Sequence, residues 1–124
     1  MEDVCAILET PAYQGLVVVD EAYIDFALEE QAQGRKHAAS QAVSAVSLVQ
    51  EYANLIVSQT LSKSFGLAGV RMGVAFAQPP IIQVMNNTKA PYNVSTLAAH
   101  AASQALAPEG IQRMRTHAKT LVEL

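Results

Sequence analysis

Two short runs of apolar residues, neither alternating with polar ones, constrain the fold of this chain most. Val17 to Val19 form the first run, and the second lies in NLIVSQT, residues 54–60. Continuous apolar strands are typical of sheets buried on both faces, as in parallel sheets covered by helices. A third short run, GVAFA, occupies residues 73–77. We therefore predict an α/β fold with a mixed, mainly parallel sheet flanked by helices.

Helices are expected around these strands. Pro79-Pro80 suits the first turn of a helix, and Ser95 or Thr96 can cap another. The polar segment EEQAQGRK, residues 29–36, is interpreted as a loop. Helices are predicted at residues 3–9, 37–52, 79–85, 97–107 and 108–124, with Val43, Val46, Leu48 and Val49 on one face of the second.

Composition limits the possible classes of protein. The 124 residues suffice for one domain, and 51% of them are hydrophobic. The net charge is −3 and the eight Lys and Arg are scattered, so a nucleic-acid partner is not expected. The single cysteine, Cys5, predicts no disulfide framework and is interpreted as a small buried side chain in a reducing, cytoplasmic protein.

Membrane and metal partners are not expected either. The start, MEDVCAIL, lacks the features of a signal peptide, and no apolar run is long enough to cross a bilayer. The histidines show no metal-ligand spacing, and we interpret them as surface or helix residues: His37, His100 and His117.

The ends of the predicted strands carry polar side chains. Asp20 and Tyr23 follow the first strand, at the position where open α/β sheets bind their ligands. Lys63 follows the second strand between hydroxyl residues and small residues. A lysine in apolar surroundings loses its charge readily and becomes a nucleophile suited to Schiff-base chemistry.

The polar residues of the two strand ends fit one cofactor, pyridoxal 5'-phosphate (PLP). Lys63 would take the aldehyde, and Asp20 would pair with the protonated ring nitrogen. Thr60, Ser62 and Arg71 offer two hydroxyls and a guanidinium for the phosphate. Tyr23 could donate to the ring oxygen beside the aldehyde. These side chains are therefore predicted to form a PLP site.

A P-loop ATPase remains an alternative. Four apolar residues followed by Asp20-Glu21 also describe the Mg²⁺-binding strand of those enzymes. The required G-x-x-x-x-G-K-[ST] loop is not found in these 124 residues. This alternative depends on a loop lying outside the chain.

Three segments resemble one enzyme family. VVVDEAYIDF, NLIVSQTLSKSFGLAGVRMGVAFA and KAPYNVST are similar to segments of histidinol-phosphate aminotransferases, which belong to the class I/II, fold-type I PLP enzymes. The similarity covers nearly the whole chain and is weakest from Glu29 to Ser47. S-K-x-F-G-L-A-G-x-R-x-G is shared by many class I/II aminotransferases, whereas D-E-A-Y-x-D-F with P-Y-N-V-S is narrower.

The resemblance implies a role for each matching residue. Lys63 would be the Schiff-base lysine and proton shuttle, Asp20 the pyridinium partner, and Tyr23 the contact to the ring hydroxyl. At the cofactor phosphate the resemblance implies Thr60, Ser62 and Arg71. Tyr92 and Asn93 lie in a family segment, but no chemistry is assigned to them.

The resemblance also implies an activity and a domain organisation. Such enzymes convert glutamate and imidazole-acetol phosphate into 2-oxoglutarate and L-histidinol phosphate in histidine biosynthesis, and they are homodimers. Residues 1–124 would be part of the large, PLP-binding domain, without its N-terminal part and the C-terminal small domain. Such a fragment alone is expected to be weak or inactive. A non-catalytic remnant that acts through dimerisation is the other alternative.

Overall fold

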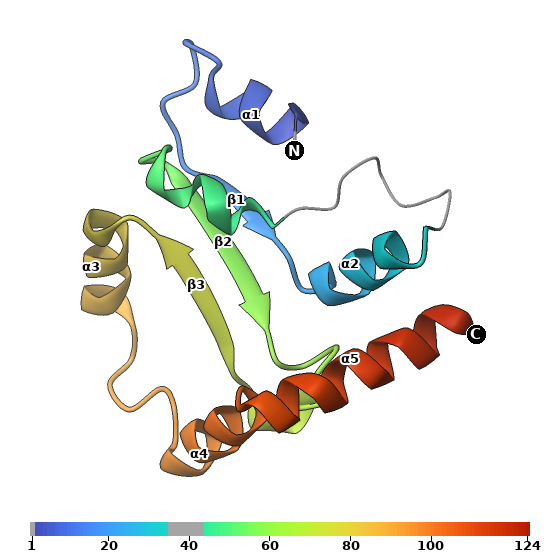
Figure 1. Cartoon of the computed structure of the whole chain (residues 1–124). Helices are drawn as coiled ribbons and strands as arrows, with labels where there is room; N and C mark the ends of the chain where they lie inside the picture. Colours follow the sequence, from blue (N-terminus) through green and yellow to red (C-terminus); the bar gives the residue numbers. More distant parts are fainter. Residues whose placement is uncertain (1, 35–43) are drawn as a thin grey trace.

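One small mixed sheet organises the computed structural model, which describes residues 2–34 and 44–124 (Figure 1). Its three strands lie in the order β1-β2-β3. β1 (Val17–Asp20) pairs with β2 (Leu55–Thr60) in parallel, and β2 pairs with β3 (Gly73–Ala77) in antiparallel fashion. The α/β fold with a mixed sheet is therefore confirmed.

The strand register places the apolar side chains of the three strands on a common face. Val17 lies opposite Leu55, and Val57 lies opposite both Val19 and Phe76. Leu55 and Val57 are completely buried and form the centre of the core. Because successive residues of a strand point to opposite faces, the residues between them line the second face.

Along β1 the second face of the sheet is open among the described residues. Val18 is 62% exposed although it stands in the middle of an apolar run. The prediction that this strand is buried on both faces is therefore wrong for the described residues, because helices cover β1 on one side only. We call this second side the open face.

Two short helical segments cover the core side of the sheet. They are α1 (Glu2–Leu8) and the 3-10 helix η1 (Ala45–Gln50). An α-helix is predicted over residues 37–52, and this prediction is wrong from residue 44 onward, where the structure has only this 3-10 segment. Residues 35–43 lie outside the described residues. Ser44 caps η1 by accepting a hydrogen bond from the backbone N–H of Val46. The predicted apolar face is nevertheless used, since Val46, Leu48 and Val49 pack on the core.

The helix α2 (Ile24–Ala32) was not expected, and the loop predicted at residues 29–36 begins inside it. Its end is marked by Gly34, which has a φ of 66° and donates its N–H to the carbonyl of Gln31. Left-handed glycine just after a helix is a common stop signal. The sequence interpretation takes this segment as a loop because it is polar and contains this glycine, whereas in the structure the glycine follows a helix.

The remaining helices follow the sequence prediction closely. α3 (Pro79–Thr88) starts at the two prolines and continues one turn beyond the expected end. α4 (Thr96–Ala105) is capped by Ser95, whose hydroxyl accepts from the N–H of Ala98. α5 (Pro108–Glu123) packs against α2 and α4 and lies below the end of β2 in Figure 1.

Two further expectations concern single residues and membranes. Cys5 is partly exposed on α1 rather than buried. His100 and His117 are exposed on α4 and α5, as expected, and His37 lies outside the described residues. In the part of the chain that the structure describes, no helix combines the length and apolarity that spanning a bilayer requires.

Candidate functional site

The carboxylate of Asp20 lies on the open face at the end of β1. Asp20 is paired in register with Ser58 of β2, and the Ser58 hydroxyl donates to Asp20 Oδ1 at 3.3 Å. The N–H of Ala22 donates to the same oxygen at 3.1 Å. Both hydrogen bonds therefore fix the carboxylate through Oδ1. Oδ2 receives none from the described residues and is available to a ligand.

Tyr23 and Lys63 are brought together from two strand ends. The Lys63 Nζ lies 5.2 Å from the centre of the Tyr23 ring, within the range of a cation–π contact. Tyr23 directly precedes α2, and the residue is 60% exposed. Since Tyr23 follows Asp20 by three residues, the lysine and the carboxylate belong to neighbouring strand ends.

The loop that carries Lys63 is held by hydrogen bonds to its backbone and to a flanking side chain. We call residues 61–67 the lysine loop. The N–H of Leu67 donates to the carbonyl of Leu61 at 3.0 Å, which closes the loop. Ser64 is 4% exposed and its hydroxyl donates to the carboxylate of Asp25 in α2. Lys63 itself is exposed, so the expected apolar surroundings are not found among the described residues.

Of the three residues predicted to bind the phosphate, Thr60 and Ser62 contact each other, whereas Arg71 donates to neither of them. The hydroxyl of Thr60 lies 2.9 Å from that of Ser62 and also donates to the carbonyl of Met72 at 3.3 Å. Arg71 is exposed and donates from Nη1 to the carbonyl of Ala68 at 3.1 Å. The two hydroxyls therefore form a pair. Arg71 stands next in the chain to the residue that Thr60 contacts.

Glu21 has a structural role that the sequence interpretation does not predict. It is 7% exposed, and its carboxylate accepts hydrogen bonds from the N–H of Ala45 at 2.6 Å, the hydroxyl of Ser44 at 2.7 Å and the amide of Gln59 at 2.8 Å. This carboxylate joins the end of β1 to η1 and β2. Glu21 is therefore turned into the interior, while its neighbour Asp20 faces out.

Tyr92 and Asn93 are far more open than the strand ends. Both are exposed, and Tyr92 is 98% exposed with a φ of 57°. Their side chains take part in none of the contacts described above.

Comparison with known proteins identifies the family. The family model described as aminotransferase class I and II matches residues 1–123. The chain belongs to this family. The P-loop ATPase alternative is thereby removed, in agreement with the interior position of Glu21.

Relatives with a named function point to one branch of these aminotransferases. The chain is 46% identical over 123 residues to a histidinol-phosphate aminotransferase of Schizosaccharomyces pombe, covering 99% of this chain and 29% of the relative. The corresponding Saccharomyces cerevisiae protein is 41% identical, with 88% and 25% covered. That of Flavobacterium johnsoniae is 36% identical, with 98% and 30% covered. The chain thus spans less than a third of the length of these relatives.

A solved structure has a similar fold. A decarboxylase from Sulfurospirillum multivorans superposes with a TM-score of 0.75 over 99% of this chain and 30% of its own, at 24% identity. At this identity the likeness concerns the fold alone. It agrees with the fold-type I assignment.

Proposed function

We propose that this chain carries the cofactor-binding centre of a histidinol-phosphate aminotransferase. The proposal is supported by the family match over residues 1–123 and by relatives of that name at 36–46% identity. The substrates would be glutamate and imidazole-acetol phosphate, giving 2-oxoglutarate and histidinol phosphate. The complete enzyme would be a cytoplasmic homodimer of which this chain forms part of the large domain.

The single observation that carries the proposal is the pairing of two strand ends. Asp20 lies beside Ser58 of the strand that leads into the lysine loop, and Lys63 lies against Tyr23 of the segment that follows Asp20. A carboxylate and an amine are thus available at neighbouring positions, with hydroxyls at Thr60 and Ser62. These groups fit the ring nitrogen, aldehyde and phosphate of PLP.

Each side chain would then have a defined task. When bound, PLP supplies an electrophilic aldehyde and a ring that withdraws electrons from the reacting carbon. Asp20 would accept a hydrogen bond from the ring nitrogen and, as an anion, would keep that nitrogen protonated. Tyr23 would orient the ring through its hydroxyl. Thr60, Ser62 and Arg71 would bind the phosphate, the guanidinium as a planar fork.

Lys63 would have two tasks. Its amine would attach the cofactor covalently, and once displaced by the amino donor it would move a proton to and from the substrate as base and acid. Its exposed position leaves the amine free to change partner. Ser64 and Asp25 would keep the loop fixed meanwhile.

A segment exchange tests the activity. The chain replaces the matching segment of the S. pombe histidinol-phosphate aminotransferase, with which it shares 46% identity. We expect the chimera to transaminate histidinol phosphate with 2-oxoglutarate, and the Lys63→Ala chimera to lose this activity by several orders of magnitude. A folded chimera that binds PLP but does not transaminate would contradict the proposal.

A further inference from the structure

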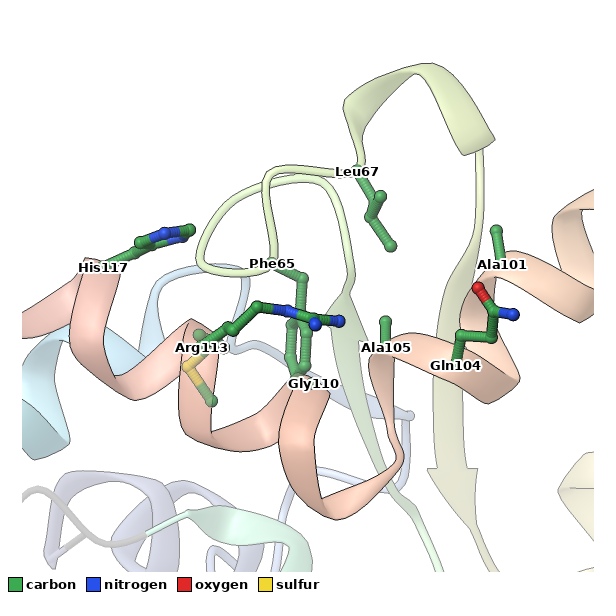
Figure 2. Close-up of a pocket in the computed structure, with 9 residues that line it drawn as sticks. Phe65, Leu67, Ala101, Gln104, Ala105, Gly110, Arg113 and His117 are labelled. Carbon is green, nitrogen blue, oxygen red and sulfur yellow. The ribbon is translucent and has the colours of Figure 1, made fainter.

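A cavity lies beside the lysine loop and is not part of the proposed cofactor site. It has a volume of about 270 Å³ and opens between that loop, α4 and α5 (Figure 2). Its apolar walls come from Phe65 and Leu67 of the loop and from Met114 of α5. Figure 2 shows Phe65 pointing toward Gly110, while Leu67 points into the space above Ala105. Neither Lys63 nor Tyr23 belongs to the described residues that line this cavity.

Three polar side chains surround the apolar walls. Arg113 and His117 stand four residues apart on α5, so they lie on the same side of the helix. Gln104 comes from α4. In Figure 2 the guanidinium of Arg113 reaches from α5 toward Ala105 on the neighbouring helix. The guanidinium N–H groups of Arg113 therefore lie beside the apolar residues that line the cavity.

Charge distinguishes this cavity from the groove on the other side of α5. The second groove also contains an arginine, Arg115, but Asp25 and Glu29 line it as well. The cavity beside the lysine loop has no carboxylate in its lining. Within residues 2–34 and 44–124, the one ion pair joins Lys119 to Glu123, so Arg113 has no described acidic partner.

We propose that this cavity binds a small organic anion with one carboxylate or phosphate and a short apolar body. Arg113 would bind the anion bidentately, with His117 donating at the side. Phe65 and Leu67 would contact the apolar body. The cavity volume of about 270 Å³ has room for a ligand as small as a short-chain carboxylate. The proposal does not depend on the aminotransferase activity.

A titration of the chain with pentanoate tests this proposal. The chemical shifts of the backbone amides are measured by two-dimensional NMR at each pentanoate concentration. We expect saturable shifts at Phe65, Leu67 and the α5 residues around Arg113. Pentylammonium, which has the same apolar body and the opposite charge, should not bind. Inorganic phosphate should bind more weakly than pentanoate, because it lacks the apolar body.

Two variants of exposed residues make the test specific. Arg113→Gln should weaken pentanoate binding about tenfold, as expected for the loss of one charged hydrogen-bond partner. Arg115→Gln removes the same charge two residues away and should leave the affinity unchanged. Equal weakening in both variants, binding of pentylammonium, or no saturable shift in the unmodified chain would each overturn the proposal.

Discussion

Arg71 combines an unusual backbone conformation with a predicted binding role. It has a φ of 56°, and Tyr92, with 57°, is the other non-glycine residue of positive φ among those described. A side chain in this left-handed region costs about 1 kcal/mol or more relative to glycine. Such a cost is expected where a residue is kept for binding rather than for stability, which is the role predicted for Arg71.

We therefore predict opposite effects on stability and binding for Arg71→Gly. The free energy of unfolding should stay equal or rise by up to about 1 kcal/mol, while the affinity for PLP should fall about tenfold through loss of the guanidinium. Denaturant unfolding and a fluorescence titration with PLP measure the two quantities. Tyr92→Gly is the matched control, which should gain stability without losing affinity. A parallel loss of both quantities in Arg71→Gly would contradict this explanation.

The buried carboxylate of Glu21 gives a second prediction at this scale. Glu21→Ala leaves the donors of Ser44, Ala45 and Gln59 without their acceptor, and should lower the free energy of unfolding by about 3 kcal/mol. Glu21→Gln should cost only about 1 kcal/mol, because the Ser44 hydroxyl and the Gln59 amide can reverse their roles. Urea unfolding measures the free energy of unfolding of both variants and so distinguishes the two expected losses. Equal losses in both variants would show that the hydrogen bonds are not the cause.

Single residues also show where sequence interpretation succeeds and fails. Asp20 and Lys63 could be singled out because each follows a strand of continuous apolar residues. Glu21 was considered only as a metal-binding residue, since its partners Ser44, Ala45 and Gln59 lie 23, 24 and 38 residues away. Nothing local predicts such a contact. The exposure of Lys63 is not predictable locally either, because it depends on which distant parts of the fold cover the lysine loop.

Among the helices, the contact between α4 and α5 requires glycine at position 110. A Cβ built on Gly110 would lie 2.2 Å from the carbonyl oxygen of Ala105, which is backbone and cannot move aside cheaply. Gly110→Ala should therefore lower the free energy of unfolding by about 1–3 kcal/mol, although alanine is the better helix former. Gly69 has open space around it and no positive φ, so Gly69→Ala is the control. Thermal unfolding of both variants gives the comparison, and equal midpoints would refute the packing argument.

The attachment of α1 should depend on pH. The Tyr52 hydroxyl donates to the Glu9 carboxylate at 2.7 Å, and this bond to an anion raises the pKa of Tyr52 well above its ordinary value of about 10. Because the folded state holds the proton more tightly, the stabilisation is complete below that ordinary value. It is lost as the pH rises through the higher folded-state pKa.

Tyr52→Phe tests this linkage. The free energy of unfolding of the variant should fall less steeply above about pH 10 than that of the unmodified chain. Tyr92→Phe is the control, since its ring is 98% exposed. Urea unfolding at a series of alkaline pH values provides the measurement. Identical slopes for Tyr52→Phe and the unmodified chain would exclude the Glu9 contact as the cause.

Elements were predictable where a local signal marks their ends. Pro79-Pro80 and Ser95 set the starts of α3 and α4 correctly, since prolines and caps act within one helical turn. An α-helix is predicted over residues 37–52, but its described part forms the 3-10 helix η1. The start of η1 is fixed by the cap at Ser44 and by the hydrogen bond from Ala45 to the distant Glu21. Helical periodicity alone cannot reveal such a tertiary constraint.

For the molecule as a whole, the open face limits what this chain can do by itself. Val18 is 62% exposed and Lys63 is exposed as well, so the described residues enclose the proposed site only in part. Exclusion of water strengthens the electrostatic interactions that catalysis uses. We therefore expect the 124-residue chain, supplied with PLP, to transaminate at least 10²-fold more slowly than the chimera described above. Comparable rates in a coupled glutamate assay would contradict this prediction.

The most direct test of the central claim is to identify the residue that PLP modifies. The claim is that Asp20 and Lys63 bind the two ends of one cofactor. After incubation with PLP and reduction with borohydride, peptide mass spectrometry should find the phosphopyridoxyl label on Lys63, and Asp20→Ala should decrease this label strongly. Lys89 and Lys119, both exposed, serve as internal controls. Label spread evenly over the three lysines, or unchanged in Asp20→Ala, would contradict the account.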